Sequence, residues 1–288
     1  MESSGVVKFS RGMVDMVLAA FFFSLMAAFV KASGHRLPFM EIVFARSLIV
    51  FGITYAWLKK HRVPVLGHRK GLLFLRGFSG FLGLTAFYFT LTHIPIADSV
   101  MLQYTSPIFT AMLSMIMLRE YSSSRLWGLY LLAFAGILLI IRPGFSFRAL
   151  PAFVGVFGAF SAGVAYNLVR LLRTTEHPMT IVLSLPLVSL VFSFPFVVRN
   201  FQMPRGWEWI WLLGVGITTQ IAQVFLTRGL MREKAAVATN VIYINVVFSA
   251  IWGIIFWHER PAWTTVMGGG IIITAIFLIN RYRITASG

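Results

Sequence analysis

The chain has 288 residues, of which 58% are hydrophobic and 12% are charged. Soluble domains carry about 25% charged residues, so a soluble enzyme, a disordered chain or a secreted mini-protein could not keep this much apolar surface from water. The formal net charge is +16 and there is no cysteine, which excludes disulfides and cysteine-ligated metal sites. We therefore predict a polytopic protein of the lipid bilayer that needs no cofactor and no metal.

Ten apolar segments follow one another along the chain, each close to the roughly 20 residues that cross a bilayer. The first segment is longer than the core of a signal peptide, about 7–15 residues, so we expect it to be retained. The predicted fold class is an all-α membrane protein of ten transmembrane helices, with tails at 1–11 and 283–288. The predicted spans are 12–32, 39–58, 71–92, 97–118, 125–141, 151–172, 179–198, 207–228, 236–257 and 262–280.

Lysine and arginine lie mostly in alternate loops between these spans. The two tails and the loops on their side hold 16 of these residues, whereas the opposite loops hold six. An excess of basic residues marks the cytoplasmic side of a membrane protein, so we expect both termini in the cytoplasm, at a bacterial inner membrane. The basic residues are spread between apolar segments rather than gathered on one face, and we expect no nucleic-acid partner.

The chain repeats itself at an offset of 139 residues. The matched pairs include Tyr104 with Tyr243, Leu91 with Leu230, Lys31 with Arg170 and Glu120 with Glu259. Each half, 12–141 and 142–282, holds five spans, and an odd number of spans makes the two halves cross the membrane in opposite senses. Inverted repeats are a feature of secondary transporters, whose sites lie near the midplane where the repeats meet. The pattern predicts alternating access around a central cavity.

Short motifs recur in the same order in both halves. They are Thr105-Ser-Pro-Ile-Phe, Arg119-Glu120, Leu126-Trp-Gly128 and Gly136 in the first half, and Phe256-Trp-His-Glu259 and Gly268 in the second. Together with Arg46 in the second span, they resemble the drug/metabolite transporter superfamily in its ten-span form with two EamA repeats. The resemblance covers about residues 12–282 and implies a transporter, not an enzyme.

Within that superfamily, the aromatic content is most similar to bacterial YddG-like exporters of aromatic amino acids. The resemblance implies a monomer that exports small amphipathic metabolites, with an aromatic or neutral amino acid as the expected substrate. The halves are not interchangeable, because the counterpart of Arg46 falls near Pro186 and that of Pro107 is Val246. The alternatives are a transporter of organophosphates, nucleotide sugars or drugs with the same fold, and a membrane-embedded enzyme.

Polar side chains inside a span are costly unless they face protein or water. We expect spans 3, 4, 8 and 9 to line the cavity and to offer amides, hydroxyls and aromatic rings to a zwitterion; Asn245 is expected to face away. The alternative is that these groups join helices to one another. The candidate residues are Tyr88, Gln103, Tyr104, Gln220, Gln223, Asn240 and Tyr243.

Arg46 lies about 10 Å from the outer end of its span at 1.5 Å per residue. It is expected either to bind a substrate carboxylate or to snorkel to the outer interface. Lys31 and Arg76 are expected to snorkel at the outer and inner ends. Glycines and a proline at Gly77, Gly80, Gly83 and Pro107 suit helix packing or gating, and Glu120 and Glu259 suit bracing of the repeats. Acidic residues inside the spans are scarce, which favours a facilitated or weakly coupled exporter.

Overall fold

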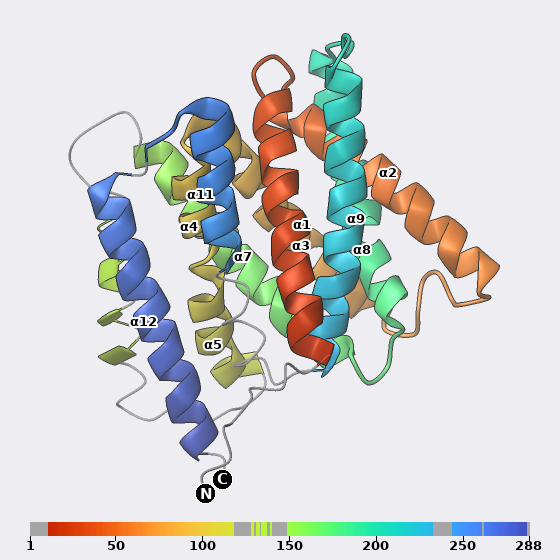
Figure 1. Cartoon of the computed structure of the whole chain (residues 1–288). Coiled ribbons are helices and arrows are strands. Elements are labelled where there is room, and N and C mark those ends of the chain that lie inside the picture. The colour runs from red at the N-terminus through yellow and green to blue at the C-terminus, as the bar shows by residue number, and fades with distance from the viewer. Residues whose placement is uncertain are drawn as a thin grey trace, which may run out of the picture.

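The computed structural model describes residues 11–117, 149–232, 244–260 and 262–286, with short stretches between 128 and 139. Within these residues the chain is helical, with no strand (Figure 1). The helices are α1 (Arg11–Ser33), α2 (Phe39–Lys60), α3 (Lys70–His93), α4 (Ile96–Gln103), α5 (Ser106–Met117), α7 (Ala149–Leu172), α8 (Pro178–Asn200), α9 (Glu208–Arg232), α11 (Ile244–Trp257) and α12 (Trp263–Ala286).

The described helices match the predicted spans, and the all-helical fold class is confirmed. Within the described residues, seven segments are long and apolar enough to cross a membrane. Shorter apolar helical stretches, Ile244–Trp257 and Trp263–Ala275, fall at the predicted ninth and tenth spans. The predicted fifth span, 125–141, lies largely outside the described residues. Helix α1 begins and α12 ends at the same end of the molecule (Figure 1).

The predicted fourth span is divided into α4 and α5. Tyr104 and Thr105 form a turn between the two helices, where the Thr105 hydroxyl donates to the carbonyl of Leu102 at 2.7 Å. The cause is Pro107, which has no N–H to give to the carbonyl one turn earlier and disfavours helical geometry at the preceding residue. This break was not predicted from the sequence.

Helix pairing follows the internal repeat. An offset of 139 residues exchanges α1 with α7, α2 with α8, α3 with α9 and α5 with α11. Under this exchange the α1–α9 contact becomes α7–α3, α1–α11 becomes α7–α5, α3–α8 becomes α9–α2, and α2–α8 maps onto itself; all of these contacts are present. Each repeat therefore packs its helices against the other repeat rather than forming a separate bundle.

The close approaches between helices show that the repeats are inverted. Gly229, late in α9, approaches the carbonyl of Gly12 at the start of α1, and Gly214, early in α9, packs on Phe29 near the end of α1. Helix α9 thus runs antiparallel to α1, whereas α3 runs parallel to α1 because one crossing helix separates them. Since α9 holds the position of α3 in the second repeat, the two repeats cross the membrane in opposite senses.

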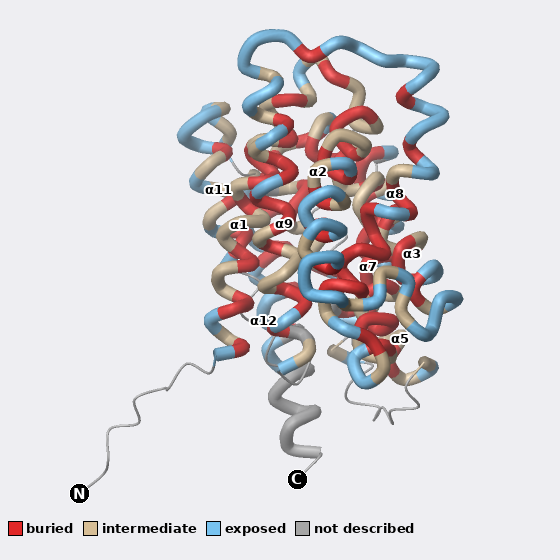
Figure 2. The backbone as a smooth tube through the Cα atoms, turned by 90° about the vertical axis from the view of Figure 1, so that its right-hand side faces the viewer, coloured by how far each residue is buried: buried red, intermediate tan, exposed pale blue. Residues whose placement is uncertain are grey.

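The outward faces of the helices are apolar. Helix α7 exposes Phe153, Phe157 and Phe160, which are spaced four and three residues apart and share one face. Helix α9 exposes a similar row. Soluble monomers rarely expose apolar patches of this extent, so these rows suit contact with lipid. Buried residues follow the inner faces of the helices, and exposed residues gather in the loops at the upper end (Figure 2).

Gly77, which was predicted to pack helices, and its repeat counterpart lie at matching close contacts. A Cβ added at Gly77 of α3 would overlap the carbonyl oxygen of Ser184 and lie 2.6 Å from Val188 in α8. Its repeat counterpart, Gly216 of α9, faces Ile49 of α2, the counterpart of Val188, at 2.6 Å. Both contacts need the absence of a side chain.

We expect Gly77→Ala to lower the free energy of unfolding by about 1–3 kcal/mol, the usual cost of overpacking. The measurement is the denaturation midpoint of the purified protein in detergent. Gly52→Ala in α2 is the matched control, because nothing lies within 4 Å of a Cβ built there, and it should be neutral or slightly stabilising. Equal midpoints for the two variants would contradict the packing assignment.

Candidate functional site

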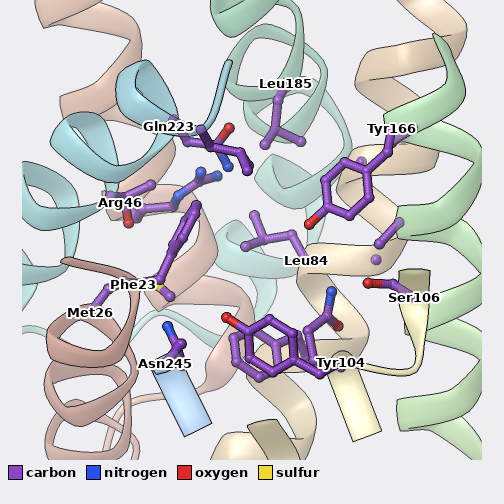
Figure 3. Close-up of a pocket in the computed structure, with 18 of the residues that line it drawn as sticks. Phe23, Met26, Arg46, Leu84, Tyr104, Ser106, Tyr166, Leu185, Gln223 and Asn245 are labelled. Carbon is purple, nitrogen blue, oxygen red and sulfur yellow. The ribbon is translucent and has the colours of Figure 1, made fainter. Parts of the chain in front are cut away.

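A cavity of about 120 Å³ lies between the two repeats (Figure 3). An apolar cavity of roughly 150 Å³ holds a molecule the size of benzene, so the space suits part of a small metabolite. The lining includes apolar side chains such as Phe23, Met26 and Leu84, together with charged and polar groups from α2, α3, α4 and α9. Such a mixture of apolar wall and a few polar groups is usual for small-molecule sites.

The lining itself is pseudo-symmetric. Seven pairs of lining residues are separated by the repeat offset of 139: Phe23 and Ala162, Met26 and Ala165, Arg46 and Leu185, Gly80 and Thr219, Leu84 and Gln223, Phe87 and Leu226, and Ser106 and Asn245. The cavity therefore lies where the two inverted repeats meet. The members of a pair differ in chemistry, as in Arg46 and Leu185, so the two repeats contribute different groups to one site.

Arg46 is fully buried in α2 and points into the cavity (Figure 3). Among the described residues, none of its three guanidinium nitrogens has a hydrogen-bond partner. The side chain therefore does not snorkel to the outer interface, which was one of its two predicted states. An arginine at a helix centre costs about 2.5–3.5 kcal/mol to insert, so a guanidinium left in this position needs an anionic partner or water.

Arg76 was expected to snorkel at the inner interface, and that prediction is wrong. Its side chain is 4% exposed and lines the same cavity as Arg46. The cause is Gly80, one helical turn later, because the Nη1 atom of Arg76 lies 2.8 Å from the position that a Cβ of Gly80 would take. The glycine leaves room for the guanidinium to stay against the helix, and the four-residue spacing of arginine and glycine was the signal that the sequence offered.

The predicted cavity residues divide into three groups. Gln103, Tyr104 and Gln223 lie in the lining, as does Arg46. Tyr88 and Gln220 lie outside it: Tyr88 is fully buried and donates to Sδ of Met26 at 3.0 Å, and Gln220 accepts from the Thr54 hydroxyl at 3.1 Å. The predicted residues Asn240, Tyr243 and Glu120 fall outside the described residues.

Helices that were not expected to line the cavity also contribute to it. Tyr166 of α7, in the predicted sixth span, points its hydroxyl into the cavity (Figure 3). Ser106, at the start of α5, also lines it and belongs to the fourth span, which was expected to do so. Asn245 of α11, expected to face away, lies in the lining and donates to the carbonyl of Ala20 at 2.7 Å. No sequence pattern signals this contact, because it depends on how α11 packs against α1.

Glu259 joins three segments at the end of the molecule where α1 ends. It forms an ion pair with Lys31 at 2.5 Å and accepts from the backbone N–H of Ile96 at 3.0 Å, while Lys31 also donates to the carbonyl of Ile94 at 3.1 Å. Lys31 is therefore bound to protein, and the prediction that it snorkels is wrong. The two side chains are each 15% exposed, which makes the pair stronger than one at the surface.

We expect Glu259→Gln and Lys31→Met each to lower the thermal midpoint, and the double variant to lower it by less than the sum. Groups in direct contact show such coupling, here about 1 kcal/mol. The measurement is a double-mutant cycle on the purified chain. The control is a second cycle in which Lys60→Met, at the exposed end of α2, takes the place of Lys31→Met. Strictly additive effects of Glu259→Gln and Lys31→Met would show that the ion pair contributes nothing to stability.

Comparison with known proteins agrees with this architecture. The model of the EamA-like transporter family matches twice, at residues 10–142 and 149–281. The two matches start at the same offset of 139 residues that pairs the lining of the cavity.

Several curated relatives are named as transporters. The pseudopaline exporter CntI of Pseudomonas aeruginosa is 34% identical over 274 residues, which cover 94% of this chain and 96% of the relative. A probable transport protein of Saccharomyces cerevisiae is 27% identical and covers 96% of this chain and 91% of its own. Solute carrier family 35 member G1 of Mus musculus is 25% identical, with coverage of 92% and 76%.

A solved crystal structure superposes with a TM-score of 0.70 at 16% identity, covering 94% of this chain and 98% of the other. At this identity the likeness shows a shared fold. The family match and the 34% identity to the Pseudomonas aeruginosa exporter together show the class of protein to which the site belongs.

Proposed function

Because the chain belongs to the EamA-like transporter family, we propose that it exports a small amphipathic metabolite, namely an amino acid, by alternating access. Transport of small molecules follows from the family. The amino-acid cargo and the outward direction are the finer proposal, supported by the cavity and by the likeness to an exporter.

The observation that carries the proposal is the unpartnered guanidinium of Arg46 in a cavity with apolar walls. A buried cation is stabilised when a carboxylate forms two parallel hydrogen bonds with it. The carboxylate of an amino acid fits this need, and the apolar lining residues, among them Phe23, Met26 and Leu84, suit the apolar part of a substrate. The preference for aromatic over other neutral side chains remains a prediction.

Proteoliposomes test the proposal directly. Vesicles that contain the purified chain are loaded with single labelled amino acids, and release is followed with and without a pH gradient. We expect release of at least one amino acid above that of protein-free vesicles. If no amino acid is released by folded protein, the proposed cargo is wrong.

An organophosphate is the second candidate, and a specific observation favours it. A phosphorylated substrate would require several basic side chains near the midplane, and Arg76 adds a second guanidinium to the one that the sequence predicts. Labelled sugar phosphates in the same vesicles distinguish the candidates, because release of sugar phosphates without release of amino acids would replace the first proposal by the second.

We also propose that both termini lie in the cytoplasm. The basic residues in alternate loops favour this orientation, and α1 begins where α12 ends (Figure 1). A tag at either terminus should react with an impermeant reagent only after the inner membrane is opened. Labelling of a terminal tag in intact spheroplasts would contradict the orientation without affecting the fold.

A further inference from the structure

Two guanidinium groups share the cavity, and neither is neutralised by the described part of the protein. Arg46 comes from α2 and Arg76 from α3, with exposed fractions of 0% and 4%. Five of their nitrogens are buried without a hydrogen-bond partner: Nε, Nη1 and Nη2 of Arg46, and Nε and Nη1 of Arg76. Such groups in a membrane interior mark substrate or ion pathways rather than stabilising contacts.

The acidic residues that the structure describes are all engaged away from the cavity. None of the six lines it, and each has a partner nearer the ends of the helices. The pairs are Asp15 with Arg232, Glu41 with the N–H of Gln202, Asp98 with the Thr265 hydroxyl, Glu176 with the N–H of Arg69, Glu208 with Arg36, and Glu259 with Lys31. Two positive charges therefore face the cavity without a described countercharge, and a bound substrate can supply it.

The cavity also offers groups that accept hydrogen bonds. The Oε1 atoms of Gln103 and Gln223 are buried and have no partner among the described residues, and both residues line the cavity. An ammonium group has three donors and no acceptor, so it complements these two amide oxygens. The site thus has unpartnered donors on two separate helices and unpartnered acceptors beside them.

From this arrangement we propose that the substrate is an amino dicarboxylate, with one carboxylate at Arg46, the other at Arg76 and the ammonium at Gln103 and Gln223. The inference rests on the proposed function and narrows it from amino acids in general to those with two acidic groups. A sugar phosphate also carries two negative charges, but it brings both on one group and lacks the ammonium that the amide oxygens suit.

The test compares isosteric ligands on the full purified chain in detergent. L-Glutamate and L-glutamine differ in one acidic group, and their binding is measured by calorimetry. We expect L-glutamate to bind about tenfold more tightly than L-glutamine. In Arg76→Gln that preference should fall to within about threefold, whereas Arg76→Lys, which keeps the charge, should retain a preference for L-glutamate. Thermal midpoints show whether each variant is folded.

Each outcome decides a different claim. Equal or tighter binding of L-glutamine, or an unchanged preference in folded Arg76→Gln, overturns the dicarboxylate inference and leaves the amino-acid proposal standing. A second outcome also overturns the inference. If O-phosphoserine binds about tenfold more tightly than L-glutamate, and L-glutamate and L-glutamine bind equally well, the two charges belong to a phosphate group. Failure of every amino acid to bind overturns the proposed function itself.

Discussion

Replacement of Arg46 by glutamine is expected to reduce amino-acid export about 100-fold or more while leaving the protein folded. The buried guanidinium is the proposed partner of the substrate carboxylate, and loss of one partner from a buried ion pair costs about 3–5 kcal/mol, where each 1.4 kcal/mol is tenfold. The fold should tolerate the change, because no described residue hydrogen-bonds to this guanidinium. The measurement is the initial rate of release from proteoliposomes.

Two controls make the Arg46 result specific. Lys60→Gln removes a positive charge from the exposed end of α2 and should transport at the wild-type rate. The thermal midpoint of Arg46→Gln should equal or exceed that of the wild type, since an unneutralised buried charge is removed. Wild-type release by folded Arg46→Gln would show that this side chain does not bind the substrate.

The second large effect is expected from Gly80→Ala, which adds one methyl group beside Arg76. A Cβ at this position would lie 2.8 Å from the Arg76 Nη1 atom and 2.9 Å from Leu185. The guanidinium is the far end of a flexible side chain, so it can move away and leave its position in the cavity. We expect transport to fall about tenfold, because a small misplacement of a binding group is sufficient for losses of this size.

The Gly80 prediction is checked with the same release assay and a matched glycine. Gly52→Ala should not change transport, because a Cβ there meets nothing within 4 Å. The double variant Gly80→Ala with Arg76→Gln should be no slower than Arg76→Gln alone if the methyl group acts through Arg76. An additional loss in the double variant would mean that Gly80 has a role of its own, such as packing against Leu185.

The spans, their order and the duplication could be predicted from the sequence because each depends on local hydrophobicity and on a fixed offset. The confirmed features are the all-helical fold and the membership of a transporter family with two repeats. The break between α4 and α5 was missed because the apolar pattern continues across it. Pro107 stands in the sequence as the signal, but a proline in a membrane helix does not always divide it.

The site was harder to predict than the fold, because helix rotation decides which polar groups meet. Four lining residues, Arg46, Gln103, Tyr104 and Gln223, come from the predicted set. Tyr88 and Gln220 are equally polar but turn toward Met26 and Thr54. The roles proposed for Asn240, Tyr243 and Glu120 remain predictions.

Arg76 shows most clearly what sequence reasoning could not supply. A basic residue about one and a half turns into a span normally reaches the interface, and that expectation fails because Gly80 provides space on the inner face. As a consequence, two guanidinium groups line the cavity, whereas the sequence predicted one. This change moves the expected substrate from a neutral amino acid toward one with a second acidic group.

The most direct test of the account is thiol labelling at the cavity, which is simple because the chain has no cysteine of its own. Ser106→Cys places a thiol in the lining, and Lys60→Cys at the exposed end of α2 serves as the accessible control. We predict that a small hydrophilic reagent labels the Ser106→Cys thiol and that saturating substrate blocks this labelling but not that of the control. If a transported substrate leaves the labelling of the Ser106→Cys thiol unchanged, the substrate binds elsewhere. That result would contradict the assignment of the site to the junction of the two repeats.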